Sequence, residues 1–430
     1  MHVLRIRGGN ALNGRVSIPG SKNAALAILS SVVLADGPVV LHNVPEVSDV
    51  AIKVGLLRQF GCDVEWREGS LFIDTSGLKY WHADEESMRP IRTGFYLLGP
   101  MLARVGRADI PMPGGCKIGA RPVDYHLKGL AIMGAKIKME GGRYVAEAPS
   151  LSGGEIHFEV PSAGATQHLM ATATLANGTF TISNAAMEPE VVALADFLKS
   201  MGARIEGAGT STVTITGVHR LSGTEFRIPE DRLQAGTYML AGAITGGEVT
   251  VTNVLPEPQT ALVSKMRETG VTVEEGHDWI TVRGDRRPKA VSIKTMPYPG
   301  FPTDIQQPMA AFLSLAEGQS LIEETLYESR TGHVEELKRM GADVTARGRM
   351  TIINGVTQLT GATVEASDLR AGAALCIAGL AAEGETIVKN VHFIDRGYEG
   401  LEERLTSLGA EIERIGLGDW EEASIGRKLT

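Results

Sequence analysis

The sequence predicts a soluble α/β protein made of two globular bodies, each built from three copies of one structural unit. The 430 residues are 43% hydrophobic and 22% charged, with a formal net charge of −9. This is the composition of an ordinary globular protein long enough for two or three domains. Two glycine-containing phrases each recur six times with a period near seventy residues. That period is too long for the common solenoids and too regular for unrelated domains.

The first recurring phrase is a helix-like segment that ends in glycine and is followed by a strand. Intervals between successive copies run from 68 (202 − 134) to 73 (134 − 61) residues. A glycine just past a helix end adopts the left-handed C-cap conformation at no steric cost. The six glycines of this marker are Gly61, Gly134, Gly202, Gly270, Gly341 and Gly409.

The second phrase is a helix of small residues that ends in glycine before a β-branched run. Its intervals run from 66 (384 − 318) to 72 (178 − 106) residues, so an independent marker keeps the same period. Its glycines are Gly37, Gly106, Gly178, Gly247, Gly318 and Gly384.

Each unit is predicted to contain a small-residue helix, a strand, a charged amphipathic helix and two short strands joined by a turn. In the fifth unit, Val334, Leu337 and Met340 share one helix face. The segment from Met350 alternates like a half-buried strand. The helix predicted from Ala371 to Ala382 is apolar nearly all round, so we expect it to be buried.

Six units fit two bodies of three units each, with the helices enclosed by sheets. We expect the chain to start in one body, cross to the other for three units and return. Crossings near Pro19–Gly20 and Ile228–Glu230 suit the marker positions. The predicted domains are therefore residues 1–20 with 230–430, and residues 21–229.

Composition and motifs exclude several classes of protein. A net charge of −9 argues against broad nucleic-acid binding, although local cations could still bind an anion. No run approaches the ~18 apolar residues of a membrane span, and no export signal is visible, so a cytoplasmic protein is expected. Zinc-protease, P-loop and Rossmann motifs are missing. We predict no metal and no cofactor, and we expect His126 and His333 to be loop or cap residues.

Charged residues stand where the small-residue helices should begin. They are Lys22, Arg92, Asp304 and Arg370, with Arg396 expected at the start of the last charged helix. A single one could be a cap or a surface charge. Several cations at helix N-termini, however, oppose the helix dipole unless an anion offsets them. The set therefore predicts a phosphate or carboxylate site, with the helix starts converging on one cleft between the bodies.

A second anomaly is the glycine-rich segment from Met112 to His126. Cys116 lies in it beside Gly115 and Lys117, with Arg121 five residues further on. Neighbouring cations favour the thiolate and make a cysteine reactive, so covalent or acid–base work is predicted. We expect the other two cysteines, Cys62 and Cys376, to be structural because each lies in an apolar helix or beside a cap glycine.

Five separated segments resemble the UDP-N-acetylglucosamine enolpyruvyl transferases, a branch of the enolpyruvyl transferase family. They are Gly20–Ala25, Pro113–Asp124, Phe301–Asp304, Asp368–Ala371 and His392–Glu399, and Asn184–Val192 adds support. The resemblance covers nearly the whole chain. It implies two inside-out α/β barrels of three βαβαββ repeats, with the active site in the cleft between them.

The resemblance also implies an activity. Such enzymes transfer the enolpyruvyl group of phosphoenolpyruvate to the 3′-hydroxyl of UDP-N-acetylglucosamine and release phosphate. This is the first committed step of peptidoglycan synthesis, on which cell shape and cell division depend. Cys116 would protonate C3 of phosphoenolpyruvate and could form a covalent adduct, and Asp304 would accept the proton of the sugar hydroxyl. Lys22 and Arg396 complete the implied catalytic set. The implied phosphoenolpyruvate site is Lys22, Asn23, Arg121, Arg330, Arg370 and Arg396.

The implied UDP-sugar site is larger. It comprises Asn23, Arg92, Arg121, Pro122, Val123, Asp124, Tyr125, Ser162, Ala163, Gly164, Asp304 and Leu326. Arg89 is a second candidate for the arginine assigned to Arg92, and counting back from the following Leu-Gly-Pro favours Arg92. Tyr125 stands where a smaller aliphatic residue is frequent in the family. Residues 416–430 extend beyond the last repeat without a predicted role.

Two alternatives share parts of this pattern. One is 5-enolpyruvylshikimate-3-phosphate synthase, which has the same fold and donor but whose sites do not use a loop cysteine. The other is a catalytically silent relative that binds a UDP-sugar, against which the complete set of charged residues argues. A monomer is expected. The sequence leaves open whether this is a main or a second isozyme and whether the cysteine adduct is obligatory.

Overall fold

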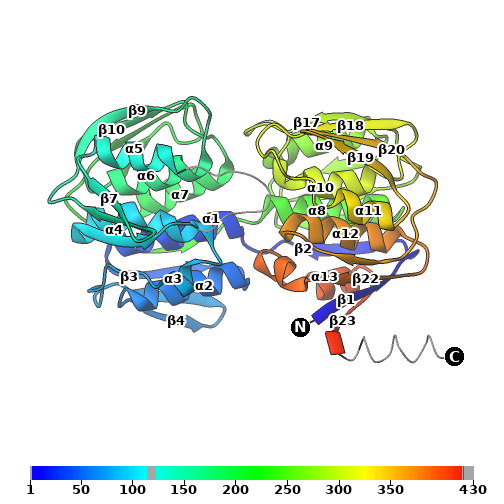
Figure 1. The fold of residues 1–430 in the computed structure, drawn as a ribbon, viewed down its shortest axis with the longest axis horizontal. Helices are drawn as coiled ribbons and strands as arrows, with labels where there is room; N and C mark the ends of the chain where they lie inside the picture. Colours follow the sequence, from blue (N-terminus) through cyan, green and yellow to red (C-terminus); the bar gives the residue numbers. More distant parts are fainter. Residues whose placement is uncertain (1, 114–122, 419, 421–430) are drawn as a thin grey trace. The chain divides into compact units, whose positions relative to one another are not determined.

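The computed structural model describes residues 2–113, 123–418 and 420, which form two compact units (Figure 1). One unit contains the chain up to Ile18 and the chain from Asp231 onward. The other contains the described residues between Pro19 and Glu230. We call them the terminal unit and the central unit, and we describe each by itself.

One sheet topology is repeated in both units. A parallel pair of strands is extended on one side by two further antiparallel strands, so that each full sheet has four strands. In the central unit, β9 (Ser152–His157) is parallel to β10 (Asn177–Ser183). The latter pairs antiparallel with β12 (Thr212–Thr216), which pairs with β11 (Arg204–Glu206). The repeated unit of sequence is thus a repeated unit of structure.

The remaining sheets of the central unit follow the same plan. One has the strand order β13 (Leu221–Arg227), β3 (Ala35–His42), β5 (Ser70–Asp74) and β4 (Asp63–Arg67). The other has β6 (Arg107–Pro111), β8 (Arg143–Glu147) and β7 (Lys136–Glu140). A single parallel bridge from His82 to Asp109 stands where a fourth strand would lie.

Three further sheets form the terminal unit. Their strand orders are β2 (Asn13–Ser17), β14 (Glu248–Thr252), β16 (Trp279–Arg283), β15 (Thr272–Glu275); β17 (Ser292–Lys294), β18 (Gln319–Glu323), β20 (Met350–Asn354), β19 (Asp343–Arg347); and β21 (Thr363–Glu365), β22 (Glu385–Lys389), β1 (His2–Arg7), β23 (Glu411–Gly416). The N-terminal strand β1 therefore lies inside the last sheet, between strands about 400 residues away in sequence.

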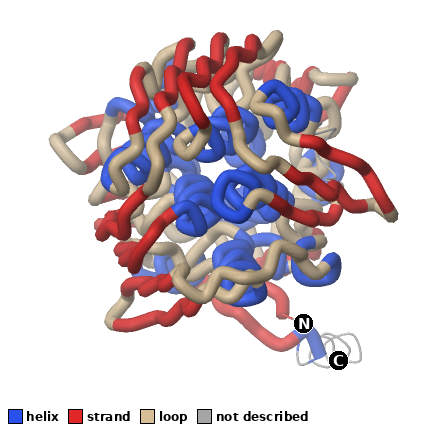
Figure 2. The backbone as a smooth tube through the Cα atoms, turned by 90° about the vertical axis from the view of Figure 1, so that its left-hand side faces the viewer, coloured by secondary structure: helices blue, strands red, loops and turns tan. Residues whose placement is uncertain are grey.

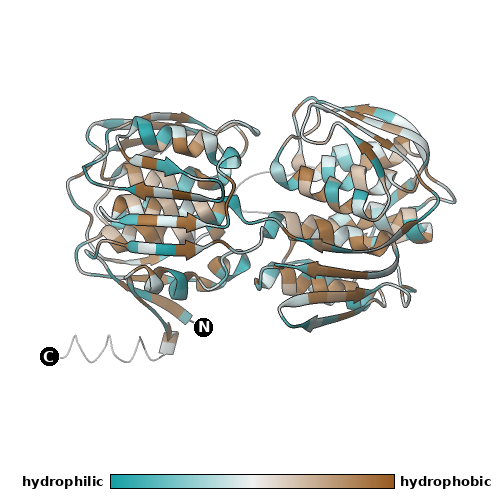
Figure 3. Ribbon diagram, turned by 180° about the vertical axis from the view of Figure 1, so that it is seen from behind, coloured by the Kyte–Doolittle hydropathy of each residue, from teal (hydrophilic) through white to brown (hydrophobic). Residues whose placement is uncertain are grey.

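Small-residue helices occupy the interior of each unit, and strands lie around them (Figures 1 and 2). They are α1 (Lys22–Ser31), α4 (Leu98–Val105) and α6 (Ala163–Ala173) in the central unit, and α8 (Arg232–Ile244), α10 (Thr303–Leu313) and α12 (Leu369–Ala381) in the terminal unit. The last three contact one another directly. Burial all round requires apolar or small residues on every face, and nearly all residues of α8 and α12 are buried. In Figure 3 hydrophobic residues are frequent in the interior of each unit. The inside-out α/β barrel is confirmed.

A second set of helices completes the repeats. They are α2 (Ser48–Gln59), α5 (Asp124–Ile132), α7 (Pro189–Ser200), α9 (Thr260–Glu268), α11 (Val334–Arg339) and α13 (Leu401–Ser407). Shorter turns of helix are η1 (Val32–Leu34), α3 (Glu85–Met88), η2 (Arg92–Leu97), η3 (Glu257–Gln259) and η4 (Val391–Arg396). Among the described residues, no helix has the length and apolar character needed to span a membrane.

The first glycine marker has the conformation that was predicted for it. All six glycines of the first marker have positive φ, between 85° and 103°. For the second marker this holds in five copies, but in the fourth the positive φ of 70° belongs to Gly246. Gly247 fills a different need there, because a Cβ at this position would lie 1.9 Å from the Leu12 carbonyl oxygen.

Three local predictions are wrong. Arg92 begins the 3-10 helix η2 and not an α-helix, because Pro100 restricts α4 to a start near Leu98. Arg396 ends η4 and is separated from α13 by two glycines, one of which, Gly400, has a left-handed conformation. His126 lies buried within α5 and is neither a loop nor a cap residue.

Candidate active site

The terminal unit gathers charge at the start of α10. Asp304 is the second residue of this helix, where the helix dipole favours a carboxylate. The Nη2 atom of Arg330 lies 2.7 Å from Asp304 Oδ1, and Arg370 Nη2 lies 3.3 Å from Oδ2. Both arginine side chains are 3% exposed, whereas that of Asp304 is 26% exposed. The carboxylate is thus the accessible end of a buried cationic pair.

Arg370 is held by its own helix and by an aromatic ring. The N-cap carboxylate of Asp368 accepts hydrogen bonds from the backbone N–H groups of Arg370 and Ala371, at 2.9 and 3.1 Å. Arg370 Nη1 donates to Tyr398 Oη at 3.2 Å, and its guanidinium lies 5.4 Å from the ring centroid. Burial opposes the charge, but Tyr398, Asp304 and Asp231 outweigh it and raise the pKa of Arg370. Arg370 is a permanent cation at this site.

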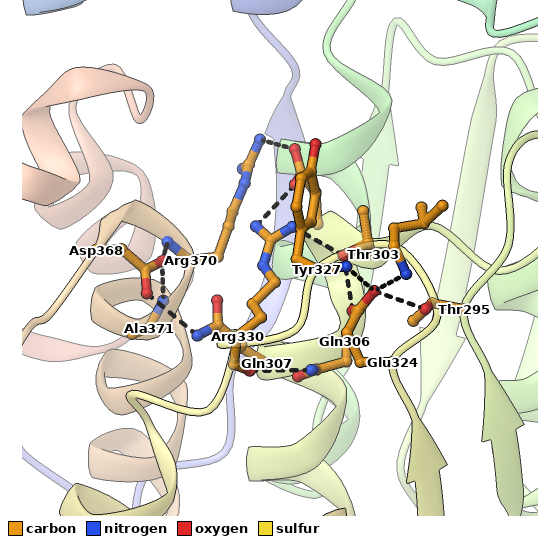
Figure 4. A network of polar contacts seen from close by, with 12 residues as sticks. Thr295, Thr303, Gln306, Gln307, Glu324, Tyr327, Arg330, Asp368, Arg370 and Ala371 are labelled. Carbon is orange, nitrogen blue, oxygen red and sulfur yellow. Dashed lines mark hydrogen bonds and ion pairs between the residues drawn. The ribbon is translucent and has the colours of Figure 1, made fainter. Parts of the chain in front are cut away.

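Arg330 is fixed by three other contacts (Figure 4). Its Nη1 donates to Thr303 Oγ1 at 2.9 Å, its guanidinium lies 5.5 Å from the Tyr327 ring centroid, and its carbonyl accepts from Gln306 Nε2 at 3.2 Å. Within the described residues, the buried Nε atoms of Arg330 and Arg370 have no hydrogen-bond partner. The two guanidinium groups nevertheless concentrate positive charge beside the accessible carboxylate, which favours binding of an anion.

Leu326 and Arg396 border this cluster in sequence. The Leu326 backbone N–H donates to the buried carboxylate of Glu324 at 2.8 Å. Arg396 is half-buried at the end of η4, two residues before the tyrosine that holds Arg370. The structure therefore unites Asp304, Arg330 and Arg370 and sets Leu326 on the adjoining loop.

In the central unit, Lys22 is the first residue of α1 and follows the N-cap Ser21. Its Nζ lies 3.5 Å from Asp49 Oδ2, and the two side chains are 11% and 5% exposed. Asn23 is the next residue of the helix and is half-buried. A cation at a helix N-terminus is thus present as predicted, and a buried carboxylate from α2 partly balances it.

Lys53 lies deeper in the same unit and is completely buried. Its Nζ donates to Ser30 Oγ at 2.8 Å and to the Thr93 carbonyl oxygen at 2.6 Å. Burial lowers the pKa of Lys53 to about 7, against the opposing charge of Asp49. This lysine links α1, α2 and the segment that carries Arg92.

Arg92 is half-buried at the start of η2, whereas Arg89 is exposed. Burial together with the charge of Arg92 lowers the pKa of His126 in α5 to about 3. The charge of Arg92 thus acts on α5, whose first turn contains Asp124 and Tyr125. Of the two candidate arginines, Arg92 is the one that is half-buried.

Tyr125 is a fixed part of the α5 start. Its ring stacks on Phe158 with centroids 4.7 Å apart, and its hydroxyl accepts from the backbone N–H groups of Glu159 and Val160 at 3.0 and 3.2 Å. The residue that departs from the family pattern ties α5 to the segment before Ser162. Val123 precedes the helix and is half-buried.

Ser162, Ala163 and Gly164 form the start of α6. The Ser162 side chain accepts from the backbone N–H of Ala165 at 3.3 Å and caps the helix. At Gly164 a Cβ would lie 2.2 Å from the Tyr96 hydroxyl oxygen, so a larger residue would require the Tyr96 side chain to shift. These three residues share a helix N-terminus, which is a favourable place for an anion.

Comparison with known proteins decides the family. The sequence model of EPSP synthase (3-phosphoshikimate 1-carboxyvinyltransferase) matches residues 6–405. A UDP-N-acetylglucosamine 1-carboxyvinyltransferase 3 from Symbiobacterium thermophilum is 49% identical, covering 96% of this chain and 98% of its own. The Clostridium botulinum UDP-N-acetylglucosamine 1-carboxyvinyltransferase is 46% identical over 96% and 100% of the two chains. The chain belongs to the UDP-N-acetylglucosamine 1-carboxyvinyltransferase family.

Solved structures agree on the fold of this carboxyvinyltransferase family. The enolpyruvyl transferase NikO from Streptomyces tendae superposes with a TM-score of 0.87 at 24% identity, covering 96% of this chain and 98% of its own. An EPSP synthase from Acinetobacter baumannii gives 0.77 at 21% identity, with 97% and 100% covered. The sister enzyme is thus similar in fold but much more distant in sequence.

Three residues expected in a carboxyvinyltransferase site, Cys116, Arg121 and Pro122, lie outside the described residues. The other two cysteines are buried, as predicted, and burial raises the pKa of the Cys62 thiol to about 12 and also raises that of Cys376. In the described part of the chain, no group of three His, Cys, Asp or Glu side chains could hold a metal ion.

Sequence reasoning missed several buried residues that contact the predicted site residues. Asp49, Lys53, Glu324 and Tyr398 are buried polar groups, and each contacts a predicted site residue or its neighbour. Glu324 directly follows the strand β18, and polar residues at strand ends were a usable signal. No signal marked Lys53, which reads as one of several charges on an amphipathic helix.

Proposed function

We propose that this protein transfers the enolpyruvyl group of phosphoenolpyruvate to the 3′-hydroxyl of UDP-N-acetylglucosamine and releases phosphate. The cluster of Asp304 with Arg330 and Arg370 carries the proposal, because it joins an accessible carboxylate to two buried cations. Relatives that share 45–49% of their residues with it carry the name of this activity. The reaction is the first committed step of peptidoglycan synthesis.

The chemistry needs both parts of that cluster. The sugar hydroxyl adds to C2 of phosphoenolpyruvate while C3 takes up a proton, which gives a tetrahedral ketal. Loss of a proton from C3 then expels phosphate and restores the double bond. We assign Asp304 as the base that accepts the hydroxyl proton. Arg330 and Arg370 would bind the donor, which carries nearly three negative charges, together with Lys22, Asn23, Arg121 and Arg396.

Cys116 is assigned as the acid that protonates C3, with the capacity to form a covalent adduct. We assign the UDP-sugar to Asn23, Arg92, Arg121, Pro122, Val123, Asp124, Tyr125, Ser162, Ala163, Gly164 and Leu326, with Asp304 at the reacting hydroxyl. The proposal requires both units to contribute to one site. We further propose that the protein is a cytoplasmic monomer that needs no metal and no cofactor.

The test is phosphate release from phosphoenolpyruvate with either UDP-N-acetylglucosamine or shikimate 3-phosphate as the acceptor. Release with UDP-N-acetylglucosamine alone is expected. Asp304→Asn should lower kcat at least ~100-fold, the usual scale of a lost acid–base group. The matched control is Asp285→Asn, an exposed carboxylate in the same unit, which should behave as wild type.

Cys116→Ser is expected to lose most of the activity with UDP-N-acetylglucosamine, because serine is a poorer acid than the thiol. Release with shikimate 3-phosphate instead would make the chain a 5-enolpyruvylshikimate-3-phosphate synthase. Binding of UDP-N-acetylglucosamine without release in the presence of either acceptor would make it a silent relative.

A further inference from the structure

Glu324 is a buried carboxylate that the proposed chemistry does not use. It directly follows β18 and is 3% exposed. Its Oε1 accepts hydrogen bonds from Thr295 Oγ1 at 2.9 Å and from the backbone N–H groups of Leu326 and Tyr327 at 2.8 and 3.2 Å. Its Oε2 accepts from Thr303 Oγ1 at 2.7 Å. All four partners are donors, so the group acts here as an acceptor only.

The bond to Thr303 has a consequence for Arg330. A hydroxyl has one proton, and Thr303 gives it to Glu324, so its lone pairs face the Nη1 of Arg330 at 2.9 Å. Arg330 then meets Asp304 with its other terminal nitrogen at 2.7 Å. Figure 4 shows Thr303 between Glu324 and Arg330. Glu324 thus fixes the direction in which the Thr303 hydroxyl donates. We call the chain of contacts from Glu324 through Thr303 and Arg330 to the accessible carboxylate of Asp304 the relay.

The other carboxylate oxygen of Glu324, Oε1, contacts a different part of the site. Leu326 and Tyr327 both donate to its Oε1, and the Tyr327 ring lies against the Arg330 guanidinium, 5.5 Å from centroid to carbon. One carboxylate therefore orients Arg330 both through a hydroxyl and through the ring, and it also shapes the Leu326 backbone.

We infer that Glu324 is a positioning residue that sets Arg330, and through it Asp304, in the geometry needed for proton removal from the acceptor hydroxyl. This inference rests on the proposed function for its catalytic consequence. It predicts that the relay fails when Glu324 can no longer accept from Thr303. Glu324→Gln offers an amide donor there, which turns the Thr303 hydroxyl around and places its proton against a guanidinium N–H.

The kinetic test uses Glu324→Gln, Thr303→Val, Thr303→Ser and the double variant Glu324→Gln/Thr303→Val. Glu324→Gln and Thr303→Val are each expected to lower kcat roughly 10- to 100-fold, the scale of a misplaced reacting group. Their effect on KM for UDP-N-acetylglucosamine should be small. Thr303→Ser keeps the hydroxyl and should restore kcat to near the wild-type value. Glu323→Gln is the matched control, because the preceding carboxylate lies on the strand and pairs with Lys294 at 3.3 Å.

The double variant separates a relay from two unrelated defects. If Glu324 acts through Thr303, the double variant should have a kcat within about threefold of the worse single variant. Fully multiplied losses would overturn the inference, and so would a Glu324→Gln variant that only melts earlier and keeps its kcat. If Glu324→Gln does not fold, the contrast between Thr303→Val and Thr303→Ser decides the same question.

A substrate-free measurement keeps this inference distinct from the proposed function. The ¹⁵N resonance of the Arg330 guanidinium should shift in Glu324→Gln and Thr303→Val and stay in place in Glu323→Gln. Absence of phosphate release by the wild-type protein would defeat the proposed function alone. An unmoved Arg330 resonance in both relay variants would defeat the positioning role alone.

Discussion

At the scale of single residues, Lys53 is a completely buried lysine. Burial lowers its pKa from 10.5 to about 7, so the folded state releases a proton that the unfolded chain keeps up to pH 10.5. Between these two values the unfolded state binds more protons, and the free energy of unfolding therefore rises with pH. The cost of burying the charge is fully present below pH 7 and disappears as pH rises towards 10.5.

Lys53→Met removes this dependence. Between pH 7.5 and 9.5, we expect the unfolding free energy of the wild-type protein, relative to that of the variant, to increase by about 1 kcal/mol per pH unit. Urea titrations at three pH values measure it. Lys338→Met is the control, because the Lys338 side chain is 41% exposed and pairs with Glu335 at the surface. Parallel pH curves for wild type and Lys53→Met would contradict the expectation.

Tyr125 provides a second test at this scale. Tyr125→Phe keeps the stacking on Phe158 and removes the hydroxyl that accepts from two backbone N–H groups. Loss of such bonds costs about 1 kcal/mol. We expect a severalfold higher KM for UDP-N-acetylglucosamine and an unchanged kcat, measured by phosphate release. A change in kcat alone would show that Tyr125 acts elsewhere.

The residues of the site were predictable to different degrees. Asp304 and Arg370 stand out in the sequence because each interrupts a helix of small residues. Arg330 was predicted only from the family resemblance, because the neighbouring residues in the sequence do not distinguish it from other arginines. Glu324 and Lys53 matter because they are buried beside these groups, and burial of a charge depends on tertiary packing that spacing along the chain does not encode.

At the scale of elements, the helix ends depend on backbone conformation more than on contacts. Gly202 follows α7 with a φ of 103°, and nothing lies within 4 Å of the point that a Cβ would occupy, so only its backbone resists a side chain. Gly55 lies inside α2, also with open space, and has no positive φ. Replacing each glycine with alanine therefore tests the same substitution in two different backbone conformations.

Gly202→Ala should destabilise the protein by about 1–2 kcal/mol, because alanine disfavours positive φ. Gly55→Ala should stabilise it by up to about 1 kcal/mol, since alanine favours helix over glycine. Chemical unfolding of both variants measures the difference. Equal effects of the same sign would contradict the conformational explanation.

A buried pair of histidines joins α5 to α6. The Gly99 N–H donates to His168 Nε2 at 2.7 Å, so His168 carries its proton on Nδ1 and donates to His126 Nδ1 at 2.8 Å. Burial lowers the pKa of His126 to about 3, and it lowers the pKa of His168 well below the ordinary value. Below pH 6.5 the two histidines bind protons in the unfolded chain but not in the folded one. The free energy of unfolding therefore falls as pH falls.

His126→Asn tests this loss. Asparagine can still accept from His168 and has no proton to gain in this range. We expect the decrease in unfolding free energy between pH 6.5 and pH 4 to be smaller in the variant than in the wild type. Urea unfolding at both pH values decides it, and an equal decrease would assign the acid sensitivity to other groups.

Element types were easier to predict than their ends. The buried helix expected from Ala371 is α12, which begins two residues earlier, because the Asp368 side chain caps it. The 3-10 character of η2 was missed, since it follows from the proline two turns further on and not from the helix-like pattern.

At the scale of the whole molecule, the two ends of the chain depend on each other. Strand β1 pairs with β22 on one side and β23 on the other, and Leu4 within it is fully buried. Leu4→Asp buries a charge in the middle of this sheet, which is costly without a partner. We expect faster amide exchange in β22 and β23 and unchanged exchange in β10 and β12 of the central unit. His2→Asp, at an exposed position of the same strand, is the control.

The number of repeats could be predicted because two glycine markers keep one period throughout the chain. The pairing of individual strands could not be predicted, although the two crossings of the chain between the bodies were expected. The sequence places β2 directly before α1, yet β2 pairs with β14, which comes more than 200 residues later, and β13 pairs with β3. Partners in a sheet are selected by tertiary packing, and a repeat shows only which segments are equivalent.

The placement of β1 also determines when the sheets of each unit can be completed during synthesis of the chain. The central unit has all its strands once residue 227 has been made, because β13 is its last strand. Strand β1 is made before every other described strand, but its partners β22 and β23 end only at residues 389 and 416. At about 5–20 residues per second, that wait lasts roughly 20 to 80 seconds. Throughout that time, a strand with a buried apolar face has no native partner, so among the described strands β1 waits longest for its sheet.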